Sequence, residues 1–127
     1  MPPAEIRSAR EHLGLSHAEL AAILAIDERS VRRWEVGTQP IHDGNARALR
    51  RIVDITASTV RRHVIELRGR PQPILVTYRS DEDMWTDHPT FAPFPARWHR
   101  IIAARVIELV PGLVISYSQA ASRDAAG

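Results

Sequence analysis

The segment LAIDERSVRRWEVG, residues 24–37, holds three arginines close together: Arg29, Arg32 and Arg33. A guanidinium group is planar and always charged, and two of its N–H donors match the O6 and N7 acceptors of guanine. Glu28 comes just before them, and its carboxylate can accept a hydrogen bond from the amino group of cytosine. We therefore predict that these four side chains contact base edges in the major groove of DNA.

The spacing of the arginines suits one face of a short helix. With about 100° between successive residues, the three arginines fall on one side. Val31 and Trp34 fall on the other side and are expected to pack in the core. Asp27 is a good N-cap residue and Gly37 a good helix end, which predicts a helix from about Glu28 to Val36.

Two further helices are expected before this one. Apolar residues recur at helical spacing from Ile6, and Gly14 suits the left-handed position that ends a helix. Ser16 and Glu19 form a capping box that starts a second helix. Because only a tight turn around residues 25–27 separates the second helix from the third, the pair is predicted to be a helix-turn-helix.

Glu35 lies at the edge of the inner face of the third helix, and a partly buried carboxylate is costly without a partner. Arg10 on the first helix is the natural candidate. The start of the second helix, with Ser16, His17 and free backbone N–H groups, is expected to hold a DNA phosphate. Further phosphate contacts are expected from polar residues in and after the third helix: Ser30, Thr38 and Gln39.

Residues 4–37 resemble the phage-repressor type (XRE-like) helix-turn-helix. The segment REHLGLSHAELAAILAIDERSVRRWEVG carries the LGLS of that family, its AEL-AxxL second helix and the W-E-x-G ending of its recognition helix. The resemblance implies base contacts by Glu28, Arg29 and Arg33.

The same resemblance implies an ion pair between Arg10 and Glu35. Two positions depart from the family pattern. His17 stands where glutamine is usual, which opens that phosphate contact to a pH dependence. Ala25 stands at a turn position that glycine often holds.

Helical periodicity resumes in a long run from Leu49 to Leu67, and we expect it to end near Gly69, before Pro71 and Pro73. This helix would connect the two halves of the chain. Its arginines leave RNA open as a second ligand: Arg47, Arg50, Arg51, Arg61, Arg62, Arg68 and Arg70.

The rest of the chain alternates short strands and helices. Strands are predicted at 74–78 and 113–117, with a short capped helix between Ser80 and Pro89 and a longer one at 96–110. The expected fold class is mainly α with a small α+β C-terminal part. The polar residues 119–127 are expected to be a disordered tail.

This order of elements looks like the anti-CRISPR-associated repressors of phages and mobile elements. Those proteins pair an N-terminal helix-turn-helix with a small dimerisation domain and repress the operon of an anti-CRISPR protein; some also bind RNA. The resemblance implies a DNA-binding domain at 1–69, a dimerisation domain at 70–118, and a homodimeric repressor that binds inverted-repeat DNA and regulates its own operon.

Residues 71–118 are mildly acidic and rich in aromatic side chains. Two short strands and two helices offer little room to bury them in one chain, so pairing of two copies is expected, with an intramolecular core as the alternative for some of them. The expected interface residues are Ile74, Val76, Tyr78, Trp85, Phe91, Phe94, Trp98, Ile102, Val114 and Tyr117.

Charge and composition limit the other function classes. All 17 basic residues are arginine, and residues 1–70 hold 12 of them against 9 acids. Such a basic front half is compatible with nucleic acid. There is no cysteine, and the six histidines lack metal-ligand spacing. We expect no catalytic residue, metal, cofactor, signal peptide or membrane span, and a cytoplasmic location.

One alternative function stays open at this point. The chain would then be the antitoxin of a toxin–antitoxin pair, which represses its own operon and binds a toxin protein with its C-terminal half. A stable homodimer without an exposed apolar patch would argue against this alternative.

Overall fold

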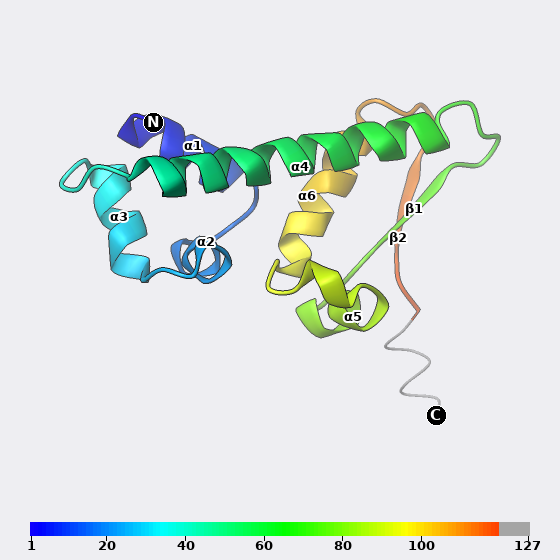
Figure 1. Cartoon of the computed structure of the whole chain (residues 1–127). Helices are drawn as coiled ribbons and strands as arrows, with labels where there is room; N and C mark the ends of the chain where they lie inside the picture. The colour runs from blue at the N-terminus through cyan, green and yellow to red at the C-terminus, as the bar shows by residue number, and fades with distance from the viewer. Residues whose placement is uncertain (120–127) are drawn as a thin grey trace. The chain divides into compact units, whose positions relative to one another are not determined.

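The computed structural model describes residues 1–119 and divides the chain into two compact units, Met1–Ser58 and a second that begins at Thr59. The predicted fold class is confirmed: the chain is mainly helical, with one two-stranded sheet in its C-terminal part (Figure 1). The prediction of a disordered tail lies, from residue 120 onward, outside the described residues.

The first unit is built from α1 (Pro3–His12), α2 (His17–Leu24), α3 (Glu28–Val36) and the beginning of α4 (Asp43–Leu67), a helix that continues into the second unit. The first three helices begin and end where the sequence predicts, whereas α4 begins at Asp43, before the periodic run from Leu49. The Ser16 hydroxyl accepts a hydrogen bond from the Glu19 amide at 3.0 Å, and the Glu19 carboxylate accepts one from the Ser16 amide at 2.7 Å. Asp27 accepts from the Ser30 amide at 2.7 Å and starts α3.

The core of the first unit lies between the inner faces of these helices. α3 packs against both α1 and α2, and α4 adds Leu49, which is fully buried. Val31 is 0% and Trp34 is 2% exposed, as the helical wheel predicts. The indole Nε1–H of Trp34 has no hydrogen-bond partner among the described residues, so Trp34 holds α3 in place by packing alone.

The turn between α2 and α3 depends on a strained residue. Ala25, at the position that glycine often holds in the family named above, has φ 57° and ψ 44° and is the only described non-glycine residue with positive φ. This left-handed conformation lets the Ala25 and Ile26 amides donate to carbonyls at the end of α2.

We therefore expect Ala25→Gly to stabilise the protein. A left-handed L-residue costs about 1–2 kcal/mol, and the greater freedom of glycine in the unfolded chain offsets about 0.5–1 kcal/mol of the gain. Urea unfolding should show a net increase of up to about 1.5 kcal/mol in the free energy of unfolding. The matched control, Ala22→Gly within α2, should lose about 1 kcal/mol. Destabilisation by both variants would show that the turn is not strained.

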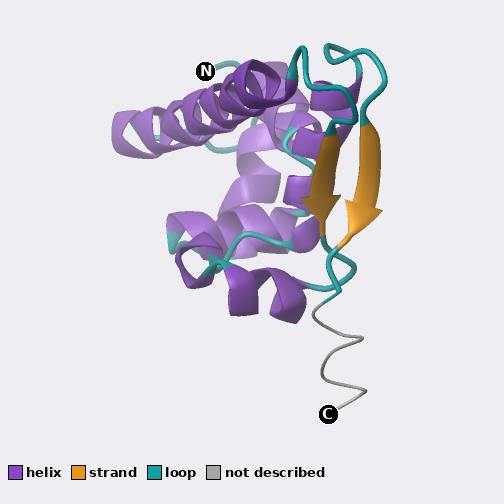
Figure 2. Ribbon diagram, turned by 90° about the vertical axis from the view of Figure 1, so that its right-hand side faces the viewer, coloured by secondary structure: helices purple, strands orange, loops and turns teal. Residues whose placement is uncertain are grey.

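The second unit contains β1 (Ile74–Thr77), α5 (Asp81–Asp87), the 3-10 helix η1 (Pro89–Phe91), α6 (Ala96–Ile107) and β2 (Val114–Tyr117). The two strands lie side by side and run parallel (Figure 2), with Ile74 opposite Val114 and Thr77 opposite Tyr117. Parallel pairing requires a crossover, which the three helices between the strands supply.

The two faces of this sheet differ in burial. Leu75 and Thr77 are buried on the side where β1 packs against α6. Alternate residues point the other way, so Ile74, Val76 and Val114 lie together on the opposite face. They are 54%, 44% and 57% exposed. We call this set the outer sheet face.

The ten residues predicted for a dimer interface divide between the core of the second unit and its surface. Tyr78, Trp98 and Ile102 are at most 4% exposed, so they belong to the core of one chain. Three more are partly buried against the cluster of Tyr78, Met84 and Ala96: Trp85, Phe91 and Phe94. The crossover between the strands folds its own aromatic side chains together, for example through the Trp85 indole N–H, which donates to the Phe94 carbonyl at 2.8 Å.

The exposed members of the predicted set are the outer sheet face and Tyr117. Tyr117 points to the side of the sheet away from that face, and the Arg79 guanidinium lies 4.1 Å from the centre of its ring. Within residues 1–119, no helix combines the length and apolar character needed to cross a membrane.

Candidate nucleic-acid interface

The face of α3 opposite the core consists of charged side chains. Glu28, Arg29, Arg32 and Arg33 are all exposed, whereas Val31 and Trp34 are buried. Since the buried pair fixes the rotation of the helix, the charged face must point to solvent. The four side chains predicted to contact bases therefore share one accessible surface of the first unit.

The structure adds a contact within this face that sequence reasoning missed. The Arg32 guanidinium donates to the Glu28 carboxylate at 2.7 Å, and these side chains are 58% and 44% exposed. Their spacing of four residues is the signal that could have predicted the pair. Arg29 and Arg33, in contrast, have no hydrogen bond from their side chains to the rest of the described chain. Their donors are available to a ligand.

Asp27, the N-cap of α3, adds a negative charge at the start of this helix. Hydrogen bonds from Ser30 hold the pKa of the Asp27 carboxyl below its usual value, so Asp27 is ionised at neutral pH. A carboxylate at this end stabilises the helix dipole. The same carboxylate would also repel a DNA phosphate from the N-terminus of α3. Contacts with DNA would therefore come from the side chains of α3 and not from the backbone at its N-terminus.

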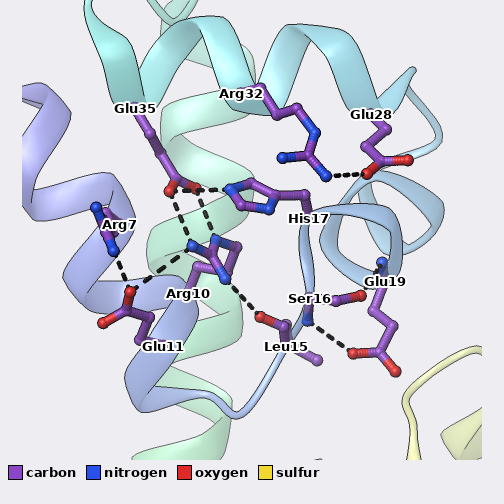
Figure 3. Close-up of polar contacts among 10 residues, drawn as sticks. All are labelled: Arg7, Arg10, Glu11, Leu15, Ser16, His17, Glu19, Glu28, Arg32 and Glu35. Atoms are coloured by element: carbon purple, nitrogen blue, oxygen red, sulfur yellow. Dashed lines mark hydrogen bonds and ion pairs between the residues drawn. The ribbon is translucent and has the colours of Figure 1, made fainter.

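Behind the exposed face, Arg10 and Glu35 join α1 to α3 (Figure 3). Arg10 Nε donates to Glu35 Oε2 at 2.7 Å and Nη2 donates to Oε1 at 2.9 Å. The third nitrogen, Nη1, donates to the Leu15 carbonyl at 3.0 Å and so also holds the turn before α2. The structure thus brings together the two residues predicted to pair. The bond to Leu15 was not predicted, because sequence spacing gives no sign of it.

The Glu35 carboxylate is charged although its side chain is only 6% exposed. Burial raises the pKa of this carboxyl, but the hydrogen bonds and charge of Arg10, together with His17, outweigh burial and leave the pKa below its usual value. The carboxylate therefore stays ionised and acts as a fixed acceptor inside the first unit.

His17, the first residue of α2, faces this acceptor (Figure 3). Its Nε2 lies 3.3 Å from Glu35 Oε1, and its side chain is 24% exposed. Sequence reasoning placed His17 at the DNA surface but missed the contact with Glu35, which depends on how the first turn of α2 packs beside α3. The position of Glu35 on the inner edge of α3 was the available signal.

The other predicted phosphate contacts lie at the two ends of α3 and at the start of α2. Ser16 is exposed, and its hydroxyl is already an acceptor in the capping box. Ser30 is half-buried and Thr38 is exposed. The amides of Thr38 and Gln39 donate to the Arg33 carbonyl at 3.1 and 3.4 Å, so the chain wraps closely around the end of the helix.

Comparison with known proteins agrees with this geometry. Residues 6–60 match a family model described as helix-turn-helix. None of the curated proteins matches the chain. The matched range contains all of α2 and α3, the turn with Ala25 and the ion pair of Arg10 with Glu35. The chain therefore carries a helix-turn-helix domain of the kind that DNA-binding transcription regulators use.

Proposed function

We propose that the chain is a homodimeric, sequence-specific repressor, active in the cytoplasm, that places α3 of each copy in the major groove of an inverted-repeat operator. The observation that carries the proposal is the exposed charged face of α3, with Arg29 and Arg33 free to bond and Trp34 buried behind them. A guanidinium in the groove reads guanine through two hydrogen bonds. The start of α2 and residues 38 and 39 would hold the flanking phosphates.

The outer sheet face supports a symmetric partner. Ile74, Val76 and Val114 form an apolar surface that the described part of the second unit leaves exposed, and contiguous apolar surface of this kind is typical of protein contacts. A second copy is the occupant we favour, because one recognition helix reads only one half-site and an inverted repeat needs two. In a two-fold dimer the same face would be buried on both copies.

We further propose that the operator lies upstream of the chain's own gene, in an operon of the anti-CRISPR-associated type carried by a phage or mobile element. The support is the order of elements: a helix-turn-helix, a long helix and a small α+β unit. The test is a gel-shift assay with DNA from upstream of the gene and of its neighbour. Because each phosphate contact contributes about −0.9 to the slope of log affinity against log salt, a salt titration counts the contacts. Absence of specific binding to either DNA would overturn the proposal.

Arg33→Ala should weaken operator binding by about 1–3 kcal/mol per half-site, which is about 5-fold to 150-fold, and relax base preference at one position. The reason is that the Arg33 guanidinium, which has no hydrogen bond to the described residues, would make a base contact in the major groove. Affinities for operators with each base pair substituted in turn would measure the effect.

The matched control for Arg33→Ala is Arg50→Ala, which removes an equally charged, exposed side chain from α4 of the same unit. It should leave the base preference unchanged. If Arg33→Ala instead lowers the affinity for every operator variant by the same factor, Arg33 is a phosphate contact.

A further inference from the structure

We propose that the second unit holds a binding site for a small aromatic carboxylate, in a hollow at the end of its sheet where Arg100 supplies the positive charge. The hollow has a volume of about 350 Å³ and is formed by β1, α6 and β2. All of its lining residues belong to the second unit, so the inference does not depend on DNA binding. They are Thr77, Arg100, Ala103, Ile115, Ser116 and Tyr117.

The hollow lies at the carboxyl end of both strands. β1 and β2 run parallel, and Thr77 and Tyr117 are their last residues and stand opposite each other (Figure 2). In open sheets of parallel strands, ligands bind outside this end of the strands. Sites for small molecules start at a volume of about 300 Å³. The position and the size of the hollow therefore both suit a ligand.

Arg100 is held in place on one side and lacks a counter-ion. Its Nη1 donates to the Tyr78 carbonyl at 2.6 Å and to the Arg79 carbonyl at 3.3 Å, and its side chain is partly buried. Among residues 1–119, its Nε and Nη2 have no hydrogen-bond partner and the guanidinium has no ion pair. Since a partly buried cation without a counter-ion favours an anion, the lining of the hollow is suited to a carboxylate, which a guanidinium binds with two parallel hydrogen bonds.

The rest of the lining suits a flat apolar group. Ala103 is 1% exposed, Ile115 is partly buried, and the ring of Tyr117 also lines the hollow. The Arg79 guanidinium lies 4.1 Å from the centre of this ring, which restrains the ring and adds a second positive charge near the hollow. A single aromatic ring can pack against Tyr117 and the aliphatic side chains while its carboxylate meets Arg100.

The test is a titration of the full chain with sodium benzoate at constant ionic strength, followed through the backbone amide resonances of the isotope-labelled protein. Resonances of residues 100–103 and 115–117 should shift and saturate, with a dissociation constant of about 1 mM, which ligand-efficiency limits allow for so small a molecule. Benzamide has the same ring and nearly the same size without the charge. It should bind at least about tenfold more weakly, because a charge-assisted contact is stronger than a neutral hydrogen bond.

R100Q should weaken benzoate binding by about tenfold or more and leave benzamide binding unchanged, since only the anion loses its partner. A general disturbance of the fold would weaken the binding of both compounds equally. Because Arg100 also bonds to two carbonyls, a second variant tests the hollow without removing the guanidinium. Ile115→Trp fills the hollow from β2 and should abolish saturable binding of benzoate.

The matched control is Arg105→Gln, which removes a partly buried arginine of the same helix that does not line the hollow. This variant should bind benzoate as wild type does. Equal affinity of the wild type for benzoate and benzamide, or an R100Q affinity for benzoate that matches wild type, would overturn the inference. Shifts that do not saturate by about 20 mM benzoate, or saturable binding that survives Ile115→Trp, would overturn it as well.

Discussion

Arg10→Ala should lower the free energy of unfolding by about 3–5 kcal/mol, the cost typical of removing one partner from a buried ion pair. Both side chains are almost fully buried, at 9% exposed for Arg10 and 6% for Glu35. Without the guanidinium, Glu35 would remain a buried carboxylate with only His17 to compensate it, and the Leu15 carbonyl would lose its donor. Urea unfolding of the full chain at about pH 7 measures the loss.

The chain offers a matched control in Arg7→Ala. Arg7 also pairs with a glutamate, Glu11, at 2.8 Å, but these side chains are 67% and 54% exposed. Solvent screens such a pair, and its removal should have little effect on unfolding. If the two variants lose the same small amount of stability, the pair of Arg10 and Glu35 is not an organising contact of the first unit.

The pH dependence of unfolding gives an independent check on the same pair. The folded pKa of Glu35 lies below its ordinary value of 4.5, so its contribution to stability is present above that value and is lost as the pH falls through the folded pKa. Wild type should therefore lose stability in acid through Glu35. The Arg10→Ala variant should lose less stability over the same acidic pH range, because protonation of Glu35 removes the unpaired buried charge that this variant contains.

Val114→Asp should convert the proposed dimer to monomers. It should also weaken operator binding by about 100-fold or more, because binding of one half-site would no longer bring a second DNA-binding domain to the other. Val114 is 57% exposed on the outer sheet face, opposite Ile74, so the single chain can tolerate a charge there. In a symmetric contact the new carboxylate would lie in apolar surface on both copies, which is costly without a partner. Analytical ultracentrifugation and operator titration measure the two effects.

Thr90→Asp is the control for added charge, because Thr90 is exposed in η1, away from the sheet. It should remain dimeric and bind the operator as wild type does. A dimer that survives Val114→Asp would exclude the outer sheet face as the interface. A wild-type chain that is monomeric would overturn the homodimer and favour the antitoxin, in which this face would meet a different protein.

Much of the first unit could be predicted because its signals are local. The capping box of Ser16 and Glu19 and the N-cap Asp27 are each contained within four residues, and the wheel of α3 needs only the helical period to separate Trp34 from the arginines. The partner of Glu35 was predictable for a different reason. A buried carboxylate needs a cationic partner, and Arg10 on the neighbouring helix was the candidate that the family resemblance also indicated.

The second unit shows what local signals leave open. Its strands and the helices α5 and α6 were predicted, but the alternating pattern does not say whether two strands run parallel or which aromatic side chains the crossover covers. Tyr78 and Trp98 are therefore core residues by virtue of contacts with segments far away in the sequence, and Val114 is exposed for the same reason.

The amino-acid sequence by itself determined where α1, α2 and α3 begin and end and which face of α3 carries charge, because caps and periodicity act between neighbouring residues. Only the tertiary structure decided that His17 bonds to Glu35 and that three apolar residues of the sheet stay uncovered. Both depend on how elements that are separate in the sequence pack against one another.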